Sequence, residues 1–292
     1  LFGRIDLLHA RMGSLGITPE AQRLLDRVHL DFVRAGAKLP PASKTRYAEV
    51  MAKLAELTTQ FSQNVLADES GYQLLLRDER DLAGLPESLR NAAKEAAVAR
   101  GVNDAYAITL SRSLIVPFLT FSERRDLREQ VQKAWASRGE HDGANDNRAL
   151  AVEILKLRQE QAALHGYATF ADYALVDRMA GTPSAVQGLL GKVWEPAKLR
   201  AAAEEDAIVA TARASGFTHS IETWDWRYFA EKVRQTRYNL DDAETKPYFE
   251  LNAMMRAMFD CAGRLFGLKF EEKQGIPMYH PDVRTFEVHN AA

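Results

Sequence analysis

Cysteine and unbalanced charge are what this 292-residue sequence has least of. Its one cysteine, Cys261, rules out an internal disulfide framework and favours a reducing compartment, so we expect a cytoplasmic protein. The 38 basic and 40 acidic residues leave a net charge of −2. A chain without a basic excess has no field that would draw it to nucleic acid or to an anionic membrane, and we expect neither as a partner.

Long apolar runs are missing as well. A transmembrane helix needs about 18 or more consecutive apolar residues, and the sequence contains no such run. Its start, Leu1-Phe2-Gly3-Arg4, has neither an initiator methionine nor the apolar stretch of a secretory signal. We therefore expect either a processed protein or an internal piece of a longer chain.

The motifs of the common hydrolases are also absent. A helical zinc peptidase needs two histidines four residues apart with a glutamate directly after the first, and no two of the seven histidines have this spacing. The stretch Gly13-Ser14-Leu15-Gly16 lacks the Gly-x-Ser-x-Gly spacing of a serine nucleophile elbow. The glycine-containing run 188–192 is too short for a phosphate-binding loop. Residue chemistry alone thus indicates a domain without an active site. His29 is interpreted as a partly buried or surface histidine on a helix, and His280, before Pro281, as a turn residue.

Helical periodicity is what the sequence has in abundance. Thr18 followed by Pro19 marks a helix start, and Gly36 marks the end of the same helix. Apolar residues recur every three or four positions through the predicted helices, which are residues 19–36, 41–65, 86–99, 122–139, 148–164 and 183–214. The short proline-containing loop between the first two predicts that they form an antiparallel pair.

Strand signals are few and short. Two runs within residues 72–110 predict a small hairpin, and further strands are expected within 268–289. The predicted fold class is therefore mainly α, a helical bundle with a minor β element. We expect two regions, 1–139 with the small hairpin and 140–292 leading into the later strands. Few residues follow the last strand, 283–289, so we expect it to lack a partner, as in a chain that has been cut.

The densest aromatic stretch runs from Thr223 to Gly267 and opens with Trp224-Asp225-Trp226. Because large aromatic side chains are unfavourable in water, this density predicts a place where several helices meet. The stretch is either packed core or one wall of a substrate cleft, and residue types alone favour the core. Cys261, which has apolar neighbours in this stretch, is expected to be buried.

Three segments carry a likeness to a known family: Lys246-Pro247-Tyr248-Phe249-Glu250-Leu251-Asn252, the helix from there to Gly267, and Tyr279-His280-Pro281-Asp282-Val283-Arg284. Together they resemble the thimet-oligopeptidase-like (M3) zinc metallopeptidases. Residues 32–37 and 145–148 extend the likeness along the chain. The Trp-Asp-Trp and Tyr-His-Pro-Asp-Val forms favour the peptidyl-dipeptidase (Dcp-like) branch of the family over the oligopeptidase A branch.

The resemblance implies a mostly helical enzyme of two lobes, in which a His-Glu-x-x-His motif and a later glutamate hold one zinc ion beside a deep channel. Such an enzyme releases dipeptides from the C-termini of short peptides. Its zinc motif lies C-terminal to the Tyr-His-Pro-Asp-Val segment, beyond Ala292, so no catalytic or metal-binding residue is assigned to this sequence. By analogy, the residues nearest the cleft are Tyr279, His280, Asp282 and Arg284.

The expected role of the chain follows from this placement. It would supply helical scaffold and one channel wall, be inactive and zinc-free by itself, and have the remaining catalytic half of the same polypeptide as its partner. Two other functions stay open. A helical module could bind short peptides without cleaving them, whereas a purely structural or interaction protein would have no peptide affinity. Peptide titration followed by tryptophan fluorescence separates these two.

Overall fold

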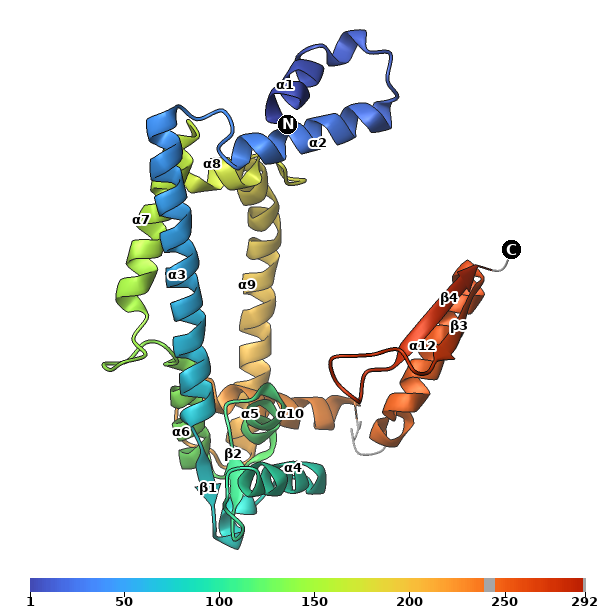
Figure 1. The fold of residues 1–292 in the computed structure, drawn as a ribbon. Helices are drawn as coiled ribbons and strands as arrows, with labels where there is room; N and C mark the ends of the chain where they lie inside the picture. Colours follow the sequence, from blue (N-terminus) through green and yellow to red (C-terminus); the bar gives the residue numbers. More distant parts are fainter. Residues whose placement is uncertain (239–244, 291–292) are drawn as a thin grey trace. The chain divides into compact units, whose positions relative to one another are not determined.

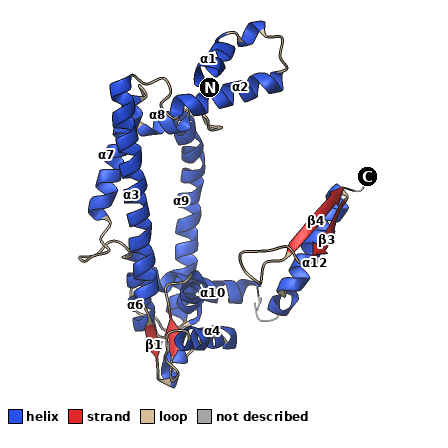
Figure 2. Cartoon of the chain, in the orientation of Figure 1, coloured by secondary structure: helices blue, strands red, loops and turns tan. Residues whose placement is uncertain are grey.

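A computed structural model of the chain describes residues 1–238 and 245–290, and it divides into two compact units, Leu1–Glu231 and Lys232–Ala292. Helices dominate the described residues (Figure 1), and the strands are few and short (Figure 2). The predicted fold class, mainly α with a minor β element, is confirmed. The predicted boundary between residues 139 and 140 lies inside the first unit and stays a prediction.

The first unit holds most of the helices, and its last helix continues into the second unit. In chain order its elements are α1 (Phe2–Ala10), η1 (Met12–Ser14), α2 (Pro19–Arg34), α3 (Pro41–Gly71), β1 (Leu74–Leu76), η2 (Glu79–Leu82), α4 (Glu87–Val98), β2 (Tyr106–Ile108), α5 (Arg112–Phe121), α6 (Arg125–Ala136), α7 (Arg148–Leu164), α8 (Phe170–Leu175), α9 (Pro183–Ala214) and α10 (Thr223–Tyr238). The predicted cap of α2 is confirmed, because the Thr18 hydroxyl accepts a hydrogen bond from the Ala21 N–H at 3.2 Å. Within the described residues, no helix is long and apolar enough to cross a membrane.

The helix pairs differ from the prediction. Helix α2 packs against α1, whereas α3 packs against α7 (Figure 1). Val50, Leu54 and Leu57 of α3 are buried against Ile154 and Leu157 of α7. The predicted antiparallel pairing of α2 with α3 is therefore wrong, because the apolar stripe of α3 is covered by a helix that lies about 100 residues further along the chain.

The larger core surrounds the β1–β2 hairpin. The two strands pair antiparallel, with Leu74 opposite Ile108 and Leu76 opposite Tyr106, as the sequence predicts for residues 72–110. Helices α4, α5 and α6 contribute further buried side chains to this core: Leu89, Ala93, Leu114, Ile115, Phe118, Leu119 and Val131. The core therefore forms where three helices cover a short hairpin. Helix α4 lies between the two strands in sequence, and α5 and α6 follow the second strand.

The second unit contains η3 (Lys246–Phe249), α12 (Leu251–Phe266), β3 (Leu268–Lys273) and β4 (Thr285–Asn290). Strands β3 and β4 pair antiparallel along their whole length. The expectation that the last strand lacks a partner is therefore wrong, because the loop between the strands returns β4 to β3. Because β4 is paired, the last strand gives no support to the expectation that the chain has been cut.

Among the described residues of the aromatic stretch 223–267, burial is confined to its beginning. Phe229 of α10 is buried, but Tyr248, Phe249 and Phe266 are exposed. In the second unit, Phe259 stacks on Phe270 with 4.4 Å between ring centroids, yet no residue of α12 is fully buried. Cys261 on this helix is exposed, so its predicted burial is wrong. The β3–β4 hairpin is too small to cover the apolar surface of a 16-residue helix.

Candidate functional site

The four residues expected near a cleft lie in the loop that joins β3 to β4. This loop borders a surface pocket of about 270 Å³, and His280 and Arg284 are part of its wall. Tyr279 and Asp282 are not part of the wall, and Tyr279 is 92% exposed. The structure thus brings two of the four residues to one pocket and leaves the other two on the open surface of the loop.

Arg284 is the most firmly held of the four. Its guanidinium donates to both carboxylate oxygens of Glu272, with Nε–Oε1 at 2.8 Å and Nη2–Oε2 at 2.6 Å. These hydrogen bonds raise the pKa of Arg284 and lower the pKa of Glu272. The arginine carbon Cζ also lies 5.1 Å from the Phe286 ring centroid. Because the planar guanidinium already holds one carboxylate in this way, Arg284 fixes the loop onto β3.

His280 makes only local contacts. Its Nδ1 accepts a hydrogen bond from the Asp282 N–H at 3.3 Å and lies 3.6 Å from the Asp282 carboxylate. This geometry agrees with the interpretation of His280 as a turn residue.

One group in the described part of the chain brings three potential metal ligands together. The donor atoms of Glu271, Glu287 and His289 lie within 4.8 Å of one another on the paired strands β3 and β4. The Lys273 ammonium, however, lies 3.2 Å from Glu271 and 2.8 Å from Glu287. The two carboxylates are exposed and share the Lys273 ammonium, and only one imidazole is present in the group. This group therefore does not fit the zinc site of a helical peptidase, which uses two histidines on one helix face.

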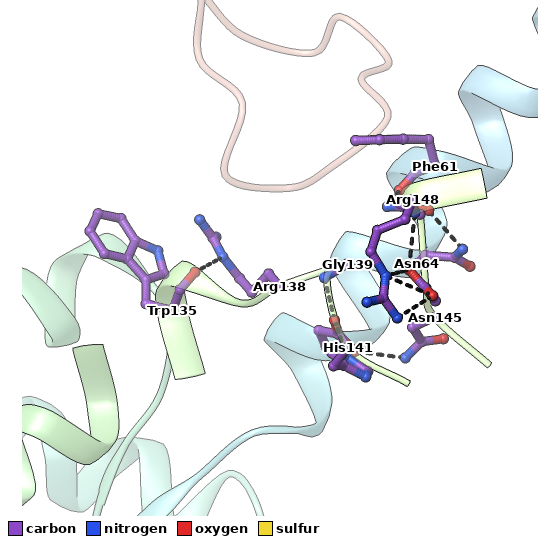
Figure 3. Close-up of polar contacts among 11 residues, drawn as sticks. Phe61, Asn64, Trp135, Arg138, Gly139, His141, Asn145 and Arg148 are labelled. Carbon is purple, nitrogen blue, oxygen red and sulfur yellow. Dashed lines mark hydrogen bonds and ion pairs between the residues drawn. The ribbon is translucent and has the colours of Figure 1, made fainter. Parts of the chain in front are cut away.

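A second polar cluster, which the sequence did not reveal as a site, ties the loop after α6 to helix α3 (Figure 3). Asp68 on α3 accepts three hydrogen bonds, from the Gly139 N–H at 2.7 Å, from His141 Nε2 at 2.8 Å and from Asn145 Nδ2 at 2.8 Å. Burial raises the pKa of Asp68, but the three donors outweigh it and hold that pKa below its usual value. The hydrogen bond to Asp68 raises the pKa of His141.

Two buried asparagines extend this cluster. Asn64 donates to Asn147 Oδ1 at 2.9 Å, and the Asn147 amide donates to the Phe61 carbonyl at 3.0 Å (Figure 3). Gly139 has φ +67°, and a Cβ at this position would lie 2.7 Å from Asn147 Nδ2. Only glycine fits there without displacing Asn147.

A pocket of about 370 Å³ lies beside the cluster, and Tyr72, Arg138 and His141 are in its wall. Burial raises the pKa of Tyr72, whose hydroxyl has no hydrogen-bond partner among the described residues. Arg138 is paired with Glu69 and also donates to the Trp135 carbonyl. Since Asp68 already accepts three hydrogen bonds and its pKa is held below the usual value, it is a weak base, and the cluster holds the loop in place.

A third cluster gives the Trp-Asp-Trp motif a structural role. The carboxylate of Asp225 is fully buried and accepts from Arg125 Nη2 at 2.9 Å and from Arg128 Nη2 at 2.8 Å. Arg128 also donates to the carbonyls of Trp224 and Ser122. Burial lowers the pKa of Arg128, whereas the hydrogen bonds that Arg125 donates to Asp225 raise the pKa of Arg125. These contacts join α6 to α10 across about 100 residues of sequence.

Comparison with known proteins assigns the family. Residues 118–292 match peptidase family M3. The chain belongs to this family. The match includes Arg125, Arg128 and Asp225, the loop around His141 and the candidate residues 279–284.

Individual M3 relatives align over nearly the whole chain. Dipeptidyl carboxypeptidase of Escherichia coli (strain K12) is 38% identical over 289 residues, which are 99% of this chain and 42% of that protein. Oligopeptidase A of the same bacterium is 33% identical over 273 residues, 92% of this chain and 40% of that protein. Saccharolysin of Saccharomyces cerevisiae is 25% identical over 281 residues. The chain therefore spans about two fifths of the length of these M3 relatives, and the resemblance found in the sequence is confirmed.

Proposed function

We propose that this chain is the helical part of an M3 zinc peptidase that releases dipeptides from the C-termini of short peptides. The observation that carries the proposal is the 38% identity to a dipeptidyl carboxypeptidase across 99% of the chain. In this role the chain supplies scaffold and one wall of the peptide channel, and we propose the cytoplasm as its compartment.

The zinc chemistry is assigned to polypeptide outside these 292 residues. No His-Glu-x-x-His motif occurs in the sequence, and the one group of ligands that converges within residues 1–238 and 245–290, Glu271, Glu287 and His289, does not fit. When bound, the zinc ion would polarise the scissile carbonyl and supply a nucleophilic water near neutral pH. The 292-residue chain by itself is therefore expected to cleave no peptide.

The residues of the β3–β4 loop would bind or position the peptide substrate without taking part in bond cleavage. The exposed ring of Tyr279 is available to pack against a peptide, while Arg284 and Glu272 hold the loop in position. His280 and Asp282 keep the turn between them closed.

The experiment compares two peptides that differ only at the C-terminus. The gene product, purified from its natural host, is incubated with a peptide that has a free C-terminal carboxylate and with its C-terminally amidated form. Mass spectrometry should detect a released dipeptide from the free acid alone, and a zinc chelator should abolish the release. Cleavage inside both peptides would indicate an oligopeptidase without the dipeptide rule. No chelator-sensitive cleavage of either peptide would refute the proposal.

An inert peptide-binding or interaction module is the second candidate. It is favoured by the absence of a zinc motif from the sequence. Such a module would bind the same free-acid peptide without cleaving it, so the mass spectrum would remain that of the intact peptide while the tryptophan emission changed.

A further inference from the structure

Helix α9 carries an apolar stripe that is buried at its C-terminal end, half-buried at Val186 and exposed between them. Ile208 and Ala212, near its C-terminal end, are buried in the first unit. Because an α-helix repeats every 3.6 residues, upstream residues at spacings of three and four lie on the same face. They are Val186, Leu190, Val193, Trp194, Ala197 and Ala201. Figure 1 shows α9 as one long helix, so this stripe is continuous with a face that already packs.

The exposure of the stripe is large. Leu190 is 60% exposed, Val193 58% and Trp194 63%. From Val186 to Ala201 the stripe is about 22 Å long, at 1.5 Å for each residue. Contiguous apolar surface that includes an open tryptophan is typical of a surface that another polypeptide covers.

Charge on the helix agrees with this division into faces. Lys192 and Glu195 lie on the side opposite the stripe, together with one isolated leucine, Leu199. Towards its C-terminal end the stripe meets charged residues, Glu204 and Glu205, and Lys198 borders it beside Trp194. Glu204 is paired with Arg200 and Lys198 with Glu195 along the helix. From Val186 to Ala197 the stripe itself carries no charge, and an uncharged face suits an apolar helical partner better than a highly charged one.

We propose that the α9 stripe is the docking face for the part of the M3 peptidase polypeptide that carries its zinc motif. The M3 match includes all of α9, and more than half of each aligned relative has no counterpart in this chain. The rest of such a polypeptide is therefore a partner that the same protein family supplies. This inference rests on the proposed function, and it assigns Leu190 and Trp194 to the buried interior of the working enzyme.

Hydroxyl-radical footprinting with mass spectrometry tests the proposal directly. The purified 292-residue chain is compared with the gene product from its natural host. Trp194 should be oxidised about tenfold more slowly in the gene product, as expected for a side chain moved from solvent into a packed interface. Leu199, on the opposite face, should react equally in both. Equal oxidation of Trp194 in the two samples would overturn the proposal.

A matched pair of variants gives a second readout. Leu190→Lys and Leu199→Lys change the same residue type on opposite faces of one helix. Both side chains are exposed in the isolated chain, so both variants should keep its circular dichroism spectrum and melting temperature. In the gene product, Leu190→Lys should restore Trp194 oxidation and lower peptidase activity, whereas Leu199→Lys should do neither. Identical behaviour of the two variants would contradict the docking face.

The remaining outcomes separate this inference from the proposed function. Protection of Trp194 in the isolated chain at high concentration, with a dimer in size-exclusion chromatography, would show that a second copy covers the stripe and would overturn the proposed occupant. A gene product that cleaves peptides while Trp194 stays reactive refutes the docking face alone. A gene product that protects Trp194 but cleaves no peptide refutes the peptidase assignment instead.

Discussion

Replacing Asp225 by alanine removes the centre of the polar joint between α6 and α10. Its carboxylate is the acceptor for Arg125 and Arg128, and the Arg128 side chain is only 2% exposed. Without Asp225 the Arg128 guanidinium remains buried with two carbonyl partners, those of Trp224 and Ser122. Breaking a buried ion pair by deleting one partner destabilises by about 3–5 kcal/mol. Because two hydrogen bonds of Arg128 survive, we expect Asp225→Ala to lower the free energy of unfolding by about 3 kcal/mol, the lower end of that range.

Urea unfolding of the 292-residue chain measures this loss. Circular dichroism follows the helices, and tryptophan fluorescence follows Trp224, which adjoins the cluster. Glu204→Ala is the control, because it removes an exposed i,i+4 pair with Arg200 and should change the free energy of unfolding by no more than about 0.5 kcal/mol. The double variant Arg128→Met with Asp225→Leu should be more stable than Asp225→Ala, since no uncompensated charge stays buried.

Two results would refute the reasoning about this joint. One is a loss below about 1 kcal/mol for Asp225→Ala, the range of exposed ion pairs. The other is a double variant no more stable than the single one, which would mean that shape and not charge determines the contact.

Three further predictions concern the His141 loop and the β3–β4 loop. Gly139→Ala should destabilise by about 1–3 kcal/mol more than Gly101→Ala in urea unfolding, because both sites have positive φ but only a Cβ at residue 139 would press on Asn147. The His141–Asp68 contact should stabilise the fold most below the ordinary histidine pKa of 6.5, and this stabilisation should be lost as the pH rises through the raised pKa of His141. The melting temperature of the wild type should therefore exceed that of His141→Asn by less at pH 8.5 than at pH 6. A difference that does not depend on pH would exclude the ion pair. At acid pH the same difference should shrink again as the pH falls through the lowered pKa of Asp68. In the gene product, Tyr279→Ala should raise KM for short peptides several-fold without changing the melting temperature, and an unchanged KM would remove Tyr279 from the channel wall.

Local features of the fold were readable from the sequence because they depend on neighbouring residues. The cap at Thr18 follows from a threonine placed directly before a proline, and the hairpin within 72–110 follows from two short apolar runs; both are present. The pairing of α2 with α3 could not be read, because periodicity shows that a helix has an apolar stripe and not which helix will cover it. Cys261 shows the same limit, since an apolar position is buried only where enough partner surface exists.

The polar clusters illustrate why sites are harder to predict than elements. The loop residues Gly139, His141 and Asn145 are close in sequence, and their polar character was evident. Their common acceptor, Asp68, is about 70 residues away on α3, and no spacing rule connects it to them. The Asp225 cluster is similar, because it spans from α6 to α10. The resemblance to the M3 family could be recognised from short motifs without any knowledge of these contacts.

Native mass spectrometry of the gene product from its natural host tests the central claim, that this chain is the zinc-free helical part of a larger M3 peptidase. We predict an assembly or polypeptide heavier than the 32.7 kDa of this chain that carries one zinc ion, and loss of the zinc with chelator should stop peptide cleavage. A free 32.7 kDa protein that holds zinc and releases dipeptides would contradict the claim. A gene product found only as a free 32.7 kDa protein without zinc would contradict it as well.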